Sequence, residues 1–330
     1  MENSLLGLAK DGQLLNHKLL KMKIISNLIC RLLFFSTLFS ITNTYAQDSH
    51  RYDPPWNTPP KSTVEFTIQG INNVPDLYGD IVDPQLVVFF AGNQFMCIDD
   101  LLEGFKKRHP HITRIFAETL PPGILAKQIE GGSLTIGNLR ITHKPDVYTA
   151  GKGRIESMED HFSRIETYAY NKLSLMVPQG NPKKIMGLID FKNQNLRISM
   201  PNPAWEGIGK QIETAYRKAG GDVLYQAIME TKVKDGTTYL TRIHHRESPL
   251  RILLEDSDVA PVWTSEVFYQ KMIGHPVQEV EIPVEENIKA AYQAGRLKNA
   301  PRAEAADLFM EYLISDEAKE IYKKYGFEVE

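Results

Sequence analysis

The sequence predicts an α/β protein with two lobes, each built on a sheet that helices flank. Continuous apolar runs of strand length, such as residues 86–90 and 259–263, alternate with amphipathic runs of helix length. Strands that are apolar on both faces are typical of parallel sheets covered by helices on both sides. This alternation occurs twice, and 330 residues are enough for two such units.

The elements of both lobes follow from this pattern. In the first half, strands are expected at 86–90, 112–116 and 146–150, and helices at 96–108, 123–130 and 154–162. In the second half, strands are expected at 173–177, 196–200 and 259–263, and helices at 207–219, 223–229 and 250–255. Gly220 and Gly221 are expected to end the longest helix. A strand at 277–282 is expected to cross back between the lobes, and 303–325 to form two helices broken at Ser315 and Asp316.

The first 46 residues read as a secretion signal rather than as part of the fold. Lys18, Lys21 and Lys23 form a basic region, an apolar run follows at 32–41, and Thr44–Ala46 places small residues at a cleavage site. The apolar run is short for a membrane span. We therefore predict a signal peptide at 1–46, cleaved near Ala46, with Met22 as the start of translation and the residues before it as an upstream extension.

Domain limits can be predicted for the remaining chain. Residues 47–84 are expected to form a Pro-rich arm and a strand at 63–69. The first lobe is expected to comprise 85–168 and 282–330, and the second lobe 169–281.

Charge and cysteine usage exclude several classes of protein. Removal of the signal, whose charge is +3, changes the net charge from −3 to −6. An acidic chain without basic clusters is a poor binder of nucleic acid. Cys30 leaves with the signal, so Cys97 has no partner for a disulfide. Cys30 also lacks the Leu that a lipid-attachment motif carries three residues before its cysteine, where this chain has Asn27, which favours a free protein in a Gram-negative periplasm.

Several segments together resemble the molybdate-type periplasmic binding proteins of ABC importers. These segments are FAGNQF (90–95), GILAKQIEGG (123–132), KPDVYTA (144–150), NKLSLMVP (171–178), VAPVW (259–263) and SDEAKEIYKKYGF (315–327). The resemblance implies a type II periplasmic-binding fold, with two mixed sheets, a hinge of two crossing strands and a ligand bound in the cleft between the lobes. It also implies a monomeric receptor without a cofactor that delivers a small inorganic ligand to a membrane permease.

Candidate ligand contacts lie where strands end and helices begin, which is where open α/β sheets bind ligands. In the first lobe these are Asn93, Gln94, Glu118 and Thr119. In the second lobe they are Trp205, Glu206, Gly207, His244, His245, Arg246, Trp263 and Thr264. We expect Arg246 to bind an oxyanion, because its planar guanidinium suits one. The alternatives are an ion pair of Arg246 with Glu247 or Glu255, and a structural role for Glu206 at a helix N-terminus.

The sequence leaves two hypotheses for the chemical class of the ligand. The resemblance favours molybdate, tungstate or a similar oxyanion. Two carboxylates facing one anion would disfavour this, since charges about 4 Å apart interact by roughly 4 kcal/mol at an effective dielectric of 20. The alternative is a transition metal ion or a metal chelate bound by His244, His245, Glu118 and Glu206.

Two functions of other classes are more remote. A periplasmic metalloenzyme would use His244 or His245 with Glu206 as a base, and a sensor would report the ligand to a membrane partner. The sequence contains no P-loop, no H-E-x-x-H and no G-x-S-x-G motif. We therefore expect a binding protein rather than an enzyme, with no catalytic residues.

Overall fold

The computed structural model describes residues 76–204, 206–243 and 245–330. The chain divides into two compact units, residues 1–52 and 53–330, and only part of the second unit is described. The predicted signal peptide, Met22 as its start and the strand at 63–69 lie outside the described residues. The same is true of two predicted ligand contacts, Trp205 and His244.

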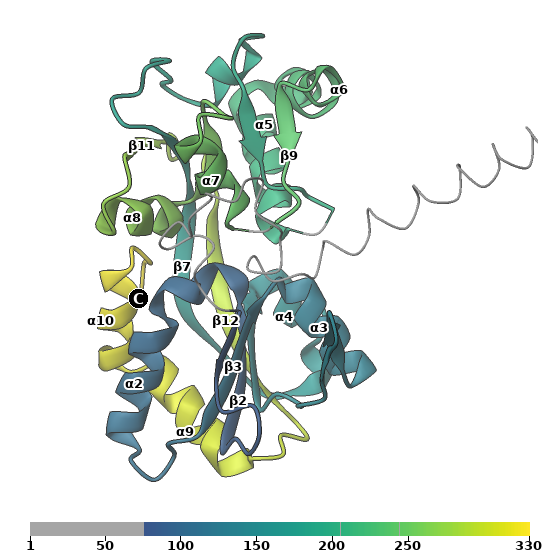
Figure 1. Cartoon of the computed structure of the whole chain (residues 1–330), viewed down its shortest axis with the longest axis vertical. Coiled ribbons are helices and arrows are strands. Elements are labelled where there is room, and N and C mark those ends of the chain that lie inside the picture. Colours follow the sequence, from purple (N-terminus) through teal and green to yellow (C-terminus); the bar gives the residue numbers. More distant parts are fainter. Residues whose placement is uncertain (1–75, 205, 244) are drawn as a thin grey trace, which may run out of the picture. The chain divides into compact units, whose positions relative to one another are not determined.

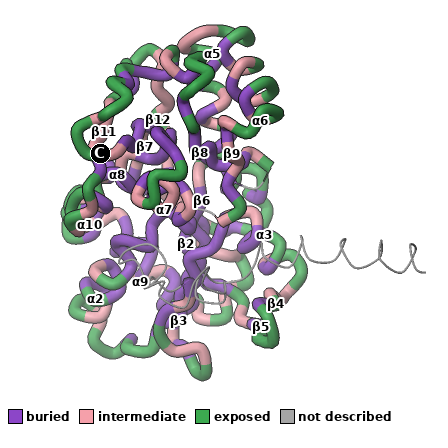
Figure 2. Tube along the Cα trace, turned by 45° about the horizontal axis from the view of Figure 1, so that its top comes forward, coloured by how far each residue is buried: buried purple, intermediate pink, exposed green. Residues whose placement is uncertain are grey.

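The first lobe is a mixed sheet between two groups of helices (Figure 1). Its strands lie in the order β1 (Leu77–Gly79), β3 (Ile115–Leu120), β2 (Leu86–Ala91), β6 (Val147–Gly151) and β12 (Lys289–Leu297). One group of helices is α2 (Ile98–Arg108), α9 (Ala303–Leu313) and α10 (Asp316–Lys324), and the other is α3 (Pro122–Gly131) and α4 (Lys152–Glu156). Shorter elements are η3 (Gly92–Cys97), η4 (Glu159–His161) and a hairpin of β4 (Leu134–Ile136) and β5 (Leu139–Ile141). β2 is parallel to β3 and β6, and every residue of β2 and β3 is buried (Figure 2).

The second lobe has its own hydrophobic core. Antiparallel β10 (Ala260–Trp263) and β11 (Val277–Glu281) flank the second half of β7 (Phe162–Pro178), and β8 (Ile198–Met200) is parallel to β9 (Thr238–Leu240). The helical elements are η5 (Leu188–Lys192), α5 (Gly207–Gln226), the π-helical turn η6 (Ala227–Thr231), α6 (Lys232–Asp235), α7 (Glu247–Leu253) and α8 (Thr264–Met272). Phe191, Ile212 and Tyr216 are fully buried at the centre of this core.

The 17-residue strand β7 joins the two lobes. Its first half pairs with β12, from Phe162 opposite Leu297 to Lys172 opposite Lys289. Its second half pairs with β10 and β11. Figure 1 shows β7 and β12 between the helices of the two lobes.

Three sequence predictions are wrong in their detail. Residues 277–281 form β11, which pairs with Leu175 and its neighbours in the second lobe and does not cross back; the crossing strand is β12. The expected helix at 154–162 ends at Glu156, and Phe162 begins β7. The strand expected at 112–116 begins three residues later, at Ile115. The strands concerned, β11, β7 and β3, carry polar residues, and a search for apolar runs does not detect such strands.

Other predictions are confirmed. The C-terminal helices are interrupted at Ser315, whose hydroxyl accepts a hydrogen bond from the Ala318 N–H and so caps α10. The long helix α5 has non-helical backbone angles at Gly220 and Gly221. No helix in the described part of the chain has the length and apolarity needed to cross a membrane.

Two glycines in the first turn of α5 provide a test of the packing. A Cβ at Gly209 would lie 2.6 Å from the backbone oxygen of Pro201, whereas a Cβ at Gly207 meets nothing within 4 Å. Gly209→Ala is therefore expected to lower the free energy of unfolding by about 1–3 kcal/mol. Gly207→Ala, at an exposed position, is the control and should change it by less than about 0.5 kcal/mol. Denaturant unfolding measures both, and equal stabilities would contradict the close packing of Gly209.

Candidate functional site

Asn93 and Gln94 lie in η3, directly after the carboxyl end of β2, and both are buried. The Asn93 amide donates to the Tyr292 hydroxyl on β12 at 2.5 Å, and the Gln94 amide donates to the Tyr168 hydroxyl on β7. Oε1 of Gln94 is buried without a hydrogen-bond partner. The two amides thus connect the end of β2 to both crossing strands.

Glu118 is a fully buried carboxyl group on β3, with one oxygen bonded and the other not. Its Oε1 accepts from Gln128 Nε2 of α3 at 2.9 Å, while Glu118 Oε2 and Gln128 Oε1 have no partner. Burial raises the pKa of Glu118 to about 7, against a smaller lowering by the bond from Gln128. A proton on Oε2 would allow Glu118 to donate to Gln128 Oε1, which would satisfy both unpartnered oxygens.

Glu206 immediately precedes α5 and is almost fully buried. Its Oε1 accepts from the Thr241 hydroxyl and from the Asn202 N–H. Burial raises the pKa of Glu206, and the nearby His245 and the bond from Thr241 oppose this rise. The location of Glu206 fits the expected acidic residue at a helix N-terminus.

His245 is held against Glu266 in a left-handed backbone conformation, with φ of 54°. Its Nδ1 contacts Glu266 Oε1, and Glu266 Oε2 accepts from the Trp263 N–H at 3.0 Å. Burial alone lowers the pKa of His245, but the carboxylates of Glu266 and Glu206 outweigh it, so the pKa is raised. The two carboxylates therefore favour the protonated form of the His245 imidazole over the neutral form.

Arg246 precedes α7 in the second lobe and forms an ion pair with Asp76, which precedes β1 in the first lobe. The side chains are only 6% and 5% exposed. The guanidinium carbon also lies 5.7 Å from the ring centre of Phe95 in η3. Burial raises the pKa of Asp76, and the guanidinium partly offsets this rise. The expected alternative partners, Glu247 and Glu255, are therefore wrong.

Candidates of both lobes lie close to residues that join the lobes. Thr119 donates its N–H to the Asp76 backbone oxygen at 2.9 Å, and its neighbour Glu118 is paired with Leu77. Trp263 lies at the end of β10, with its ring centre 6.1 Å from that of Tyr292. The side chain of Glu118 differs from these, because it bonds to Gln128 of α3, within the first lobe.

Thr264 and Gly207 begin helices, as expected. Thr264 is the first residue of α8, and its buried hydroxyl has no hydrogen-bond partner. Gly207 is the first residue of α5 and is exposed. Both can approach a ligand closely, one with a hydroxyl and one with backbone.

Sequence reasoning missed the residues that hold these candidates in place. Asp76, Thr241, Tyr168 and Tyr292 each bind a predicted contact. Only Glu266, two residues after Thr264, carried a visible signal, as an acidic residue in the first turn of a helix.

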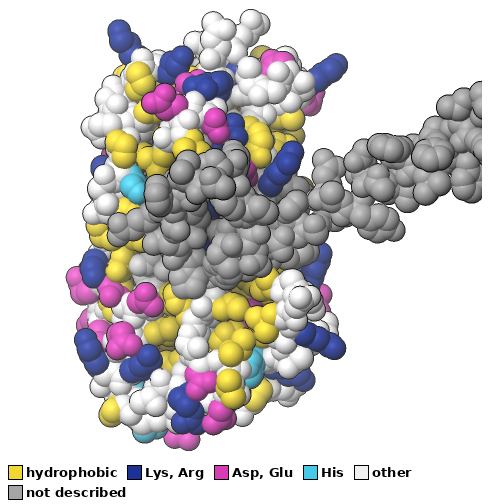
Figure 3. All heavy atoms as spheres, viewed as in Figure 1, with side chains coloured by type: hydrophobic (Ala, Val, Ile, Leu, Met, Phe, Trp, Pro, Cys, Tyr) yellow, Lys and Arg dark blue, Asp and Glu magenta, His cyan; other side chains and the backbone are white. Residues whose placement is uncertain are grey.

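A metal site receives no support from the described residues, among which no three His, Cys, Asp or Glu side chains are placed to hold an ion. His244 lies outside them, so the metal alternative stays a prediction. Figure 3 shows acidic and basic side chains interspersed on the described part of one face, over both lobes.

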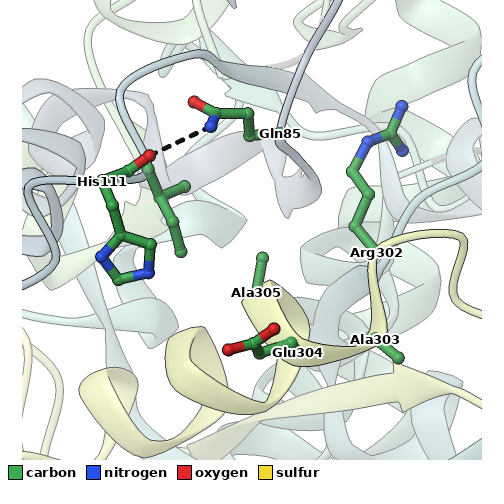
Figure 4. Close-up of a pocket in the computed structure, with 7 residues that line it drawn as sticks. Gln85, His111, Arg302, Ala303, Glu304 and Ala305 are labelled. Atoms are coloured by element: carbon green, nitrogen blue, oxygen red, sulfur yellow. Dashed lines mark hydrogen bonds between the residues drawn. The ribbon is translucent and has the colours of Figure 1, made fainter.

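A pocket of about 280 Å³ lies at the opposite end of β2 from Asn93. Figure 4 shows Gln85, His111 and Glu304 around it, with Arg302 at its edge. Gln85 Nε2 donates to the His111 backbone oxygen at 3.0 Å, and Arg302 Nε donates to the Pro84 oxygen at 2.6 Å. These contacts occupy the polar groups of Gln85 and Arg302, and the pocket takes no part in the site above.

Comparison with known proteins identifies relatives of this arrangement. Residues 86–328 match the family described as bacterial extracellular solute-binding protein. No curated protein matches significantly. The molybdate-binding protein of Azotobacter vinelandii has a TM-score of 0.59 at 18% identity, covering 74% of this chain and 99% of its own. The sulfate-binding protein SubI of Mycobacterium tuberculosis has a TM-score of 0.60 at 15% identity, covering 73% of this chain and 85% of its own. The periplasmic binding protein AfuA of Actinobacillus pleuropneumoniae, with fructose-6-phosphate bound, has a TM-score of 0.58 at 15% identity, covering 75% of this chain and 85% of its own. The predicted type II periplasmic-binding fold is confirmed.

Glu118→Gln is expected to reduce the pH dependence of stability. The pKa of Glu118 is about 7 in the folded chain against an ordinary value of 4.5, so between these values the folded state holds a proton that the unfolded chain has released. The free energy of unfolding therefore falls as the pH rises from 4.5 to 7, by about 3 kcal/mol at most. An amide at position 118 can both donate to and accept from Gln128, and should make the fall smaller by the contribution of Glu118, while other buried groups with a raised pKa, such as Glu206, keep theirs.

Denaturant unfolding over this pH range measures the effect. Glu103→Gln is the control, because Glu103 is exposed on α2, and it should keep the wild-type slope. If Glu118→Gln also kept that slope, Glu118 would not be the group that holds the proton.

Proposed function

The chain belongs to the bacterial extracellular solute-binding proteins, and from this premise we propose that it is the periplasmic receptor of an ABC importer. Residues 1–46 serve as the signal peptide that directs export, and cleavage near Ala46 releases the mature protein. The lobes comprise 85–168 with 282–330, and 169–281, and β1 with the preceding Asp76 adds an edge strand to the first of them. The receptor acts as a monomer, binds a small ligand between the lobes and delivers it to a membrane permease.

The ligand that we propose is a small oxyanion of the molybdate or tungstate type. The ion pair of Arg246 is the observation that carries this proposal. A carboxylate of the first lobe bonds to a guanidinium of the second, and the same guanidinium suits the oxygens of an oxyanion. Relatives of the same fold bind molybdate and sulfate.

Neutral hydrogen-bond donors complete the proposed site. The Thr264 hydroxyl has no hydrogen-bond partner among the residues that the structure describes, so it can donate to a ligand oxygen. Asn93, Thr119 and Gly207 supply amide, hydroxyl and backbone N–H groups, and Trp263 forms a wall. Since His245 and Arg246 already have carboxylate partners, an incoming oxyanion exchanges with those partners.

The mechanism follows from the connection of the lobes. A ligand that contacts both lobes stabilises the closed form more than the open form, because some of its contacts exist only after closure. Bending of β7 and of the segments around β12 permits this change. The permease then recognises the closed form.

The test is thermal melting of the chelator-stripped protein with molybdate, tungstate, sulfate and phosphate, and in parallel with divalent and ferric metals. A ligand at 100-fold its Kd adds about 2.7 kcal/mol, or a shift on the order of 5–10 °C for this size. An oxyanion is expected to give this shift. A shift with metals alone would favour the His and Glu alternative, and no shift at all would contradict the proposed ligand class.

Arg246→Gln combined with Asp76→Asn tests the proposed contact without leaving an unpaired buried charge. The double variant is expected to lose the oxyanion shift, which calorimetric titration with the same oxyanion would confirm. Arg197→Gln is the control, because Arg197 pairs with Asp258 within the second lobe at 2.8 Å, and it should retain the shift. Full binding by the double variant would exclude Arg246 as a contact.

A further inference from the structure

Asp76 is anchored to the first lobe by its backbone. Its oxygen accepts from the Thr119 N–H at 2.9 Å, and Leu77 pairs with Glu118 at the edge of the sheet. The carboxylate is thereby presented from the residue before β1, beside the carboxyl end of β3, where the predicted ligand contacts Glu118 and Thr119 lie. The location of Asp76 is therefore fixed independently of the side chain that it binds.

Arg246 is anchored to the second lobe in the same way. Its backbone oxygen accepts from the Leu250 N–H at 3.2 Å in the first turn of α7. The side chain extends out of that lobe to Asp76 and to the ring of Phe95, both in the first lobe. The contact thus joins the lobes away from the crossing strands.

The ion pair is buried on both sides, with 6% and 5% of the side chains exposed. A guanidinium removed from water needs an anionic partner, because an unpaired buried charge costs several kcal/mol. When the lobes are closed without a ligand, the Asp76 carboxylate supplies that anion. An oxyanion at the same guanidinium would supply it equally well.

We propose that Asp76 is an internal substitute for the ligand, which holds the lobes together when no ligand is bound and which the ligand's anionic group displaces from Arg246. This inference rests on the proposed oxyanion receptor for its second part only. The first part, closure of the ligand-free protein by the ion pair, concerns the chain alone.

Asp76 and the ligand compete for Arg246, and this competition weakens the apparent affinity of the protein for the ligand. If its carboxylate occupies Arg246 about nine-tenths of the time, the binding-competent fraction is about one-tenth, and the apparent Kd is about tenfold weaker than the intrinsic Kd. Removing the carboxylate should recover this factor. A merely structural ion pair that persists in the complex would give the opposite result, a loss of affinity.

The deciding experiment measures the separation of the lobes in the ligand-free chain. Spin labels are placed at Lys107→Cys on α2 and Lys234→Cys on α6, two exposed positions, after Cys30 and Cys97 are replaced by Ala. Pulsed electron–electron double resonance then gives the distribution of distances between the two labels, with and without Asp76→Asn. We expect the substitution to shift the distribution to longer distances, and an unchanged distribution overturns the proposal.

Asp258→Asn is the matched control, because it removes a carboxylate from the arginine pair within the second lobe. It should leave the distance distribution unchanged; an equal opening in this control would assign the effect to general destabilisation and overturn the proposal.

A second measurement separates this inference from the proposed function. Calorimetric titration with molybdate, sulfate and inorganic phosphate should give a Kd about tenfold lower for Asp76→Asn than for the wild type. Equal or weaker binding by the variant contradicts displacement of Asp76. If neither protein binds these anions but the lobes open, the oxyanion function fails while closure by Asp76 stands.

Discussion

The rest of the structure depends on one continuous strand, β7, which both lobes share. Its first half is held by β12 and its second half by β10 and β11. Phe309 and Tyr216 lie in two separate hydrophobic cores, one in each lobe. The cores touch near the shared strand, where Tyr269 of α8 packs against the first core and the ring centres of Trp263 and Tyr292 lie 6.1 Å apart. Bending between the lobes therefore has to rearrange these ring contacts, while the rest of each core stays intact.

The polar groups near this strand are satisfied mainly from within the chain. Asn93 and Gln94 donate to tyrosines of β12 and β7, and Asn171 of β7 donates to Ser265 of α8 at 2.8 Å. Buried donors without partners would be costly, so these bonds fix the ends of η3 and α8 relative to the crossing strands. The candidate site is consequently organised before any ligand arrives, and binding exchanges existing bonds for new ones.

The sequence predicted the buried strands well and the half-exposed ones poorly, for a physical reason. β2 and β10 are apolar on both faces, which gives a run that no other element imitates at that length. β7 alternates exposed and half-buried residues between Phe162 and Tyr168, and β12 carries Lys289, Gln293 and Arg296, so neither gives such a run.

The candidate site shows the same division between local and distant information. Strand ends and helix starts located Asn93, Thr119, Glu206 and Thr264 from local pattern alone. The partners were hidden, because Arg246 meets Asp76 across 170 residues of sequence and Asn93 meets Tyr292 across 199. No local pattern contains the charge of a residue that only the fold brings close. This is why the sequence suggests a ligand or the nearby Glu247 and Glu255 as partners of Arg246, whereas the fold pairs it with Asp76.

This chain has to recognise an anion through contacts within the site, and not through the charge of its whole surface. The whole sequence carries a net charge of −3, and charges of both signs alternate on the described surface in Figure 3. At physiological ionic strength such charges are screened over about 8 Å, so they neither attract an anion from solution nor repel it once it is bound. Within the buried region, Arg246 is paired with Asp76 and His245 with Glu266. Selectivity then depends on how well a ligand's oxygens replace the bonds that two carboxylates already make, and therefore on geometry more than on charge.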